Sequence, residues 1–222
     1  MALHKTQNRV CVYCGEIGTT NDHVPPENLF PIPRPNDLIT VPSCLRCNNG
    51  FSRDDEHFRT IIACDEESAG HPQAQRLWSG KILRQLHRAG GKGGGAAIPE
   101  LIRQSFGSAA NVTQAQVCAS ECRIARVLIR IVEALHYEET GERVPTGWEV
   151  RVNLSPDFTA CDGLGGARRL FESTPGFCGR DIGDGVFSYR MVRLPNQEHA
   201  HAWFLQFFAK RAFLSSTGPR QA

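Results

Sequence analysis

Two Cys-x-x-Cys pairs constrain this chain more than any other feature of its sequence. Cys11 and Cys14 form the first pair, Cys44 and Cys47 form the second, and 29 residues separate the two pairs. Two residues between thiols let a tight turn aim both sulfurs at one ion, and Gly15 gives a permissive backbone directly after the first pair. The spacing predicts that the four thiolates close on one structural Zn²⁺, a site that holds its segment together and performs no chemistry itself.

The other cysteines do not extend this pattern. The chain has nine cysteines, and its first residues lack the apolar core of a signal peptide, so we expect reduced thiols and a cytoplasmic location. The two pairs have two alternative interpretations: small apolar packing residues, or a redox dithiol, which would leave the matching second pair unexplained. Cys118 and Cys122 are four residues apart, and we interpret them as packing residues on one helix face.

Composition and charge narrow the class of protein. With 222 residues and 41% hydrophobic content the chain can bury a core, and no stretch approaches the roughly 18 apolar residues of a membrane span. The net charge is only +2, and residues 1–64 carry six Lys and Arg against seven Asp and Glu. Residues 151–222 carry nine Lys and Arg against six Asp and Glu. Any electrostatic attraction for phosphate is therefore expected mainly outside the first segment.

We predict three parts along the chain: a small zinc-stapled domain at 1–64, a helix with a glycine-rich linker at 65–98, and an α+β domain of unassigned role at 99–222. An apolar stripe at helical spacing predicts an amphipathic helix over 72–88, whose basic face is either solvated or in contact with phosphate. That face consists of Lys81, Arg84 and Arg88. The tract AGGKGGGAA at 89–97 is typical of a flexible linker.

The third part mixes helical and strand-like patterns. Apolar residues recur at helical spacing over 114–137 and predict a long, mostly buried helix that stops at Gly141. Runs rich in aromatic and β-branched residues predict strands over 148–154, 185–194 and 202–208. The aromatic residues of these runs are interpreted as core rather than as a platform for bases: Trp148, Trp203, Phe207 and Phe208.

Polar residues of the kind used in catalysis lie beside the cysteine pairs. The run NDHVPP at 21–26 lies between the pairs, and Asn48 directly follows Cys47. A lone Asp-His in a loop usually makes a turn or a surface hydrogen bond, but its place between two cysteine pairs favours a functional role for Asp22 and His23. Asn48 has a second interpretation, because Asn is a preferred residue at helix N-caps.

Over about residues 11–60 the chain resembles the zinc-knuckle branch of the HNH endonucleases. The resemblance lies in Asp22-His23-Val24-Pro25, in Asp37-Leu38-Ile39-Thr40-Val41 and in Cys47-Asn48. Two details depart from the family. Asp37 stands where the family usually has its central Asn, with Asn36 one position earlier, and Pro42-Ser43 is a two-residue extension before Cys44.

The resemblance implies a small ββα-metal (HNH) fold in the first segment and an endonuclease that hydrolyses phosphodiester bonds of nucleic acid, with DNA as the expected substrate. It also implies that Asp22 and Asn48 bind a divalent cation, Mg²⁺ or Mn²⁺, and that His23 is the general base. The chemistry agrees with these roles. Hard cations prefer carboxylate and amide oxygens, and imidazole, with a pKa of about 6.5, can accept a proton near neutral pH.

Other polar residues of the first segment are assigned weaker roles. His57 is left out of the site because nine residues after Asn48 is about 2.5 helical turns, which places it on the opposite helix face. The acidic run Asp54-Asp55-Glu56 would oppose DNA and is interpreted as a response to the helix dipole. Three arginines are candidate phosphate contacts: Arg46, Arg53 and Arg59.

Two other functions compete with the nuclease. One is a non-catalytic zinc-knuckle module that binds nucleic acid or a protein partner, which the near-neutral charge of the first segment favours. The other is a metal-dependent hydrolase of a non-nucleic substrate, which the lack of a basic stripe favours. A zinc deaminase is excluded because the sequence lacks a His-x-Glu ahead of a Pro-Cys-x-x-Cys.

Overall fold

The structure is a computed structural model that describes residues 9–65, 68–84, 114–154, 161–195 and 197–220. It contains a two-stranded hairpin, a five-stranded sheet and several helices, which confirms the predicted α+β class. None of the helices in these ranges combines the length and the apolar character needed to cross a bilayer. The predicted linker at 89–97 lies outside the described residues.

The first segment is a hairpin followed by two helices. Strand β1 (Thr20–Val24) pairs antiparallel with β2 (Ile39–Ser43), and the short 3-10 helix η1 (Glu27–Leu29) lies between them in the chain. Helices α1 (Leu45–Gly50) and α2 (Ser52–Cys64) follow. The predicted Pro42-Ser43 extension belongs to β2, so it lengthens the hairpin at the end that leads into the second cysteine pair.

The predicted amphipathic helix begins as expected. Helix α3 (Pro72–Leu77) has proline in its first turn, and its N-cap His71 accepts a hydrogen bond from the backbone N–H of Gln73 through Nδ1. It continues as the π-helical turn η2 (Trp78–Ile82). Leu77 and Ile82 are buried, as the apolar stripe predicted.

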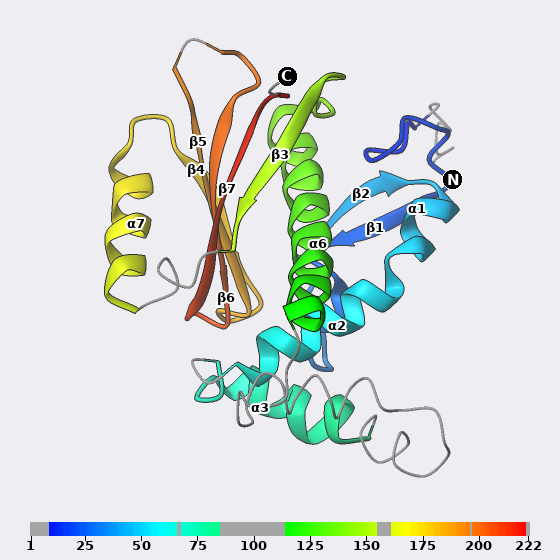
Figure 1. Ribbon diagram of the computed structural model, residues 1–222, viewed down its shortest axis with the longest axis vertical. Coiled ribbons are helices and arrows are strands. Elements are labelled where there is room, and N and C mark those ends of the chain that lie inside the picture. The colour runs from blue at the N-terminus through cyan, green and yellow to red at the C-terminus, as the bar shows by residue number, and fades with distance from the viewer. Residues whose placement is uncertain (1–8, 66–67, 85–113, 155–160, 196, 221–222) are drawn as a thin grey trace, which may run out of the picture.

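The second half of the chain builds an antiparallel sheet in the order β3-β7-β6-β5-β4. Its strands are β3 (Trp148–Asn153), β4 (Cys178–Ile182), β5 (Phe187–Arg193), β6 (His201–Phe207) and β7 (Arg211–Pro219). The three predicted strands are confirmed as β3, β5 and β6. Helix α7 (Cys161–Ser173) lies on one face of this sheet (Figure 1).

The long helix α6 (Gln114–Thr140) lies between the opposite face of the sheet and the β1–β2 hairpin (Figure 1). Its buried apolar side chains belong to the hydrophobic cluster that also contains residues of the hairpin and of the sheet: Val127, Leu128, Ile131, Val132 and Leu135. The helix ends at Thr140, and Gly141 follows with a φ of +76°, a conformation that favours glycine. Cys122 on this helix is exposed, so its interpretation as a packing residue is wrong.

One hydrophobic cluster contains side chains from both the first segment and the sheet. Phe58 on α2 meets Phe207 on β6 edge to face, with ring centroids 5.2 Å apart. Trp203, Phe207 and Phe208 are fully or almost fully buried, which confirms their interpretation as core residues. The division into domains at 1–64 and 99–222 stays a prediction, but the cluster shows that these two parts share packed side chains.

Candidate metal centre and adjoining pocket

The first cysteine pair lies on a tight turn that requires glycine. The backbone N–H of Gly15 donates to the carbonyl oxygen of Cys11 at 3.0 Å, and Gly15 has a φ of +81°. A Cβ at this position would lie 2.7 Å from Nη1 of Arg143. The positive φ therefore favours glycine at this position, and a larger side chain would displace the end of Arg143.

The second pair opens helix α1. Cys44 is the N-cap, and its Sγ accepts a hydrogen bond of 3.4 Å from the backbone N–H of Cys47. The two pairs meet because the N–H of Val12 donates to the carbonyl oxygen of Pro42 at 3.0 Å. The hairpin strand β2 thus brings Cys44 beside the first pair.

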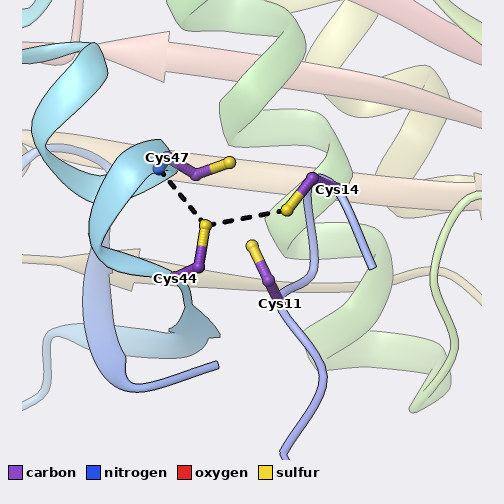
Figure 2. Close-up of side chains that lie close together, drawn as sticks. All are labelled: Cys11, Cys14, Cys44 and Cys47. Carbon is purple, nitrogen blue, oxygen red and sulfur yellow. Dashed lines mark hydrogen bonds between the residues drawn. The ribbon is translucent and has the colours of Figure 1, made fainter. Parts of the chain in front are cut away.

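All four sulfurs point toward one another (Figure 2). The four Sγ atoms lie within 4.8 Å of one another, and those of Cys14 and Cys44 are 3.6 Å apart. A tetrahedral zinc with Zn–S bonds of about 2.3 Å needs sulfurs about 3.8 Å apart. Within the described part of the chain, no other group of three or more His, Cys, Asp or Glu ligand atoms is gathered in this way. These cysteines could hold a metal ion such as zinc.

The thiols of this cluster cannot all be ionised without a cation. Burial alone would raise the pKa of the Cys11 thiol, but hydrogen bonds from the backbone of Cys44, Cys14 and Tyr13 outweigh it and lower that pKa to about 6. Burial and hydrogen bonds to neighbouring sulfurs raise the pKa of Cys47. A bound divalent cation would stabilise all four thiolates, so metal binding should release protons.

A pocket of about 390 Å³ lies beside the cysteine cluster. The three residues that the sequence marks out, Asp22, His23 and Asn48, all line it. Of the candidate phosphate contacts, Arg59 lines this pocket, whereas Arg46 instead pairs with Glu16 at 3.2 Å on the exposed surface. His57, which was left out of the predicted site, is buried and does not line the pocket.

His23 is half-exposed at the wall of this pocket. Its Nδ1 lies 3.9 Å from Oε2 of Glu27, and the same oxygen pairs with Arg34 at 3.1 Å. Glu27 therefore faces one ring nitrogen of His23 with a negative charge that Arg34 partly neutralises.

Asn48 is tied to the hairpin. Its Nδ2 donates to Oγ1 of Thr20 and to the carbonyl oxygen of Asn21, each at 3.1 Å. Asn48 is not an N-cap, because helix α1 begins three residues earlier and Cys44 caps it. Both hydrogen bonds use the amide nitrogen, so Oδ1 is the atom that remains for a ligand.

Asp22 is buried, and two residues that sequence reasoning missed hold its carboxylate. The hydroxyl of Tyr13 donates to Oδ2 at 2.6 Å. The guanidinium of Arg130 on α6 lies with Nε 3.1 Å from Oδ2 and donates from Nη2 to Oδ1 at 3.3 Å. Burial, followed by the negative charge of Asp22, raises the pKa of Tyr13, so its hydroxyl remains a donor.

The acidic run of α2 pairs with α6. Asp54 accepts hydrogen bonds from Arg123 and Arg126 at 2.8 and 2.9 Å, and Asp55 accepts from Arg130 at 3.1 Å. Burial raises the pKa of Asp55 to about 6, although Arg130 opposes this shift. The two aspartates of the run are thus neutralised by the protein's own arginines. The arginines recur on α6 at helical spacing, and this was the sequence signal that could have revealed the pairing.

A histidine cluster lies away from the pocket. His201 is the first residue of strand β6, His199 lies two residues before it, and the ring centroid of His136 on α6 is 5.1 Å from that of His201. His136 is fully buried, and neither ring nitrogen has a hydrogen-bond partner in the described residues. Burial, followed by the proximity of His201 and His199, lowers the pKa of His136 to about 4.

Comparison with known proteins finds no matching family model, no matching curated protein and no matching solved structure. The case for a function therefore rests on the residues and the geometry described above.

Proposed function

We propose that this protein is a metal-dependent HNH-type endonuclease that hydrolyses phosphodiester bonds of nucleic acid, with DNA as the expected substrate. The observation that carries the proposal is the position of Asp22, His23 and Asn48 around one pocket beside the four-cysteine cluster. Three residues from β1 and α1 meet there although 25 positions separate His23 from Asn48 in the sequence.

The donor atoms around the pocket suit a hard cation. Asp22 offers a carboxylate and Asn48 offers its Oδ1, and both are oxygen ligands of the kind that Mg²⁺ and Mn²⁺ prefer. When bound, such a cation supplies positive charge that stabilises the phosphate and the leaving oxygen. The zinc of the cysteine cluster would hold β2 and α1 in place and so fix Asn48 relative to Asp22.

His23 has the exposure and the partner of a general base. Its ring reaches the pocket, so the imidazole can accept a proton from a water that attacks phosphorus while the P–O bond to the leaving oxygen breaks. Glu27 lies near Nδ1, which leaves Nε2 as the nitrogen that takes the proton.

The test is cleavage of supercoiled plasmid and single-stranded DNA with Mg²⁺ or Mn²⁺, with wild type compared with His23→Ala. His199→Ala is the matched control, since His199 lies outside the pocket. Zinc content is measured for all three proteins. We expect wild type and the control to cut and His23→Ala to lose at least 100-fold in rate, the lower end of a general base's contribution. Equal cleavage by His23→Ala, or none by the zinc-loaded wild type, would contradict the proposal.

One observation favours a second candidate, a non-catalytic zinc-knuckle module that binds nucleic acid or a protein partner. Asp22 already has an arginine and a tyrosine as partners, as expected of a structural carboxylate. Such a module would bind DNA or RNA with an affinity that falls steeply with salt, without any turnover. Binding measured at several salt concentrations alongside the cleavage assay separates the two functions.

A further inference from the structure

Asp22 is contacted by two residues outside the three predicted site residues, Tyr13 and Arg130. We propose that Tyr13 and Arg130 are positioning residues that hold Asp22 with one oxygen directed to the divalent cation. This inference rests on the proposed function, because it assigns the two residues to the same site. The sequence resemblance includes neither residue.

The hydrogen bonds at Asp22 are unequal. Oδ2 is contacted by the Tyr13 hydroxyl at 2.6 Å and by Nε of Arg130 at 3.1 Å. Among the residues that the structure describes, Oδ1 has only the longer contact to Nη2 of Arg130, at 3.3 Å. An ionised carboxylate has about four lone-pair sites, two on each oxygen, so Oδ2 is filled and Oδ1 keeps room for one more partner. Arg130 therefore orients the carboxylate without using all of its capacity to bind a cation.

Tyr13 links this carboxylate to the cysteine cluster. It is one of the two residues between Cys11 and Cys14, so a metal held by these thiols also fixes the position of the tyrosine ring. The ring packs near Phe51, with centroids 6.4 Å apart. Tyr13 thus belongs to the turn that carries two of the four cysteines, and its hydroxyl contacts the carboxylate that is proposed to bind the cation.

Arg130 is itself held in place. Its side chain is only 4% exposed, pairs with Asp55 through Nη1 and Nη2, and lies over the ring of Phe51 at 4.7 Å. A planar guanidinium satisfies two carboxylates and stacks on a ring at the same time, which the ammonium group of lysine does not do. Arg130→Lys should therefore fail to replace it.

Outer-shell partners of metal-binding carboxylates typically change metal affinity by about 10- to 100-fold when removed. The test measures Mn²⁺ binding by electron paramagnetic resonance, on the full-length, zinc-loaded protein. Tyr13→Phe removes only the hydroxyl, and Tyr137→Phe, a tyrosine on α6 outside the pocket, is the matched control. We expect Tyr13→Phe to bind Mn²⁺ about 10-fold or more weakly, with unchanged zinc content, and Tyr137→Phe to bind like wild type.

If Tyr13 only positions Asp22, an excess of Mn²⁺ should restore the cleavage rate of its variant. Cleavage by Tyr13→Phe should approach the wild-type rate at saturating Mn²⁺, because the hydroxyl affects cation binding and not the base. Arg130→Lys provides the second variant and should weaken Mn²⁺ binding at least as much. Unchanged Mn²⁺ affinity in Tyr13→Phe, with binding lost in Asp22→Asn, overturns this inference and leaves the proposed nuclease intact. Absence of Mn²⁺ binding in wild type overturns both.

Discussion

Nε of Arg143 donates a hydrogen bond of 2.9 Å to the carbonyl oxygen of Val12, inside the first Cys-x-x-Cys pair. Arg143 follows the end of α6, 131 residues after Val12 in the chain. Its Nη2 reaches the next carbonyl oxygen, that of Tyr13, at 3.4 Å. The turn between Cys11 and Cys14 is therefore stabilised by Arg143 as well as by any metal that the cysteines bind.

Removing this contact should weaken the metal-loaded fold. We expect Arg143→Ala to lower the free energy of unfolding by about 1–3 kcal/mol, because a charged donor to two carbonyl oxygens is lost. Urea denaturation of the zinc-loaded protein measures the change. Arg169→Ala, an exposed arginine on α7, should leave the unfolding midpoint unchanged. If both variants unfold like wild type, the contact does not stabilise the turn.

The cysteine cluster predicts one zinc per chain. Cys44→Ser should lose most of the zinc and lower the melting temperature, because it removes a thiolate ligand, whereas serine can still cap α1. Elemental analysis of the purified proteins gives the stoichiometry. Cys122→Ser is the control, since this exposed thiol is not part of the cluster, and it should retain a full equivalent of zinc. Zinc retained by Cys44→Ser would argue against a four-thiolate site.

Acid should destabilise the fold through His136. Its pKa is about 4 in the folded protein and about 6.5 when exposed, so the unfolded chain binds the proton first as the pH falls. Stability from this residue is complete above pH 6.5 and is lost between there and pH 4, by about 3 kcal/mol. His136→Phe should flatten the pH dependence of unfolding in this window, whereas His23→Gln, which changes a half-exposed histidine outside this cluster, should not. A slope that is the same in His136→Phe would assign the acid sensitivity elsewhere.

The shared core should make the two predicted domains unfold together. Phe58→Ala is expected to cost about 3–5 kcal/mol, because it removes a fully buried ring that packs on Phe207 of the sheet. Calorimetry should show one transition that moves to lower temperature as a whole. Phe177→Ala, which changes an exposed aromatic ring, should have little effect. Two transitions, of which only one moves, would mean that the two parts unfold separately.

Local patterns of the sequence were sufficient for much of the fold and part of the site. The spacing within each cysteine pair predicted a tight turn, and the presence of two such pairs predicted that the four sulfurs gather at one point. The helix over 114–137 and three strands followed from spacing and composition. Strands β4 and β7 were missed because polar and glycine residues interrupt their patterns, as in the CGRDI of β4. Their pairing depends on neighbours that the local sequence does not identify.

The side chains that hold Asp22 were beyond local patterns for a different reason. Arg130 looks like a surface residue of a long helix, and only the packing of α6 against the hairpin buries it between Asp22 and Asp55. Tyr13 looks like an incidental residue between two cysteines. Tyr13 reaches Asp22 from the cysteine turn, and Arg130 reaches it from α6. Contacts between separate elements of this kind can be identified only when the tertiary arrangement is known.

The separation of 108 positions between Asp22 and Arg130 in the sequence also sets an order of events during biosynthesis. At about 5–20 residues per second, translation needs roughly 5–20 seconds to pass from one to the other. In that interval the cysteines of the first segment can come together, yet Asp22 on the hairpin and Asp55 on α2 still lack the guanidinium of Arg130. The pocket is therefore completed only after the ribosome has passed Arg130 on α6.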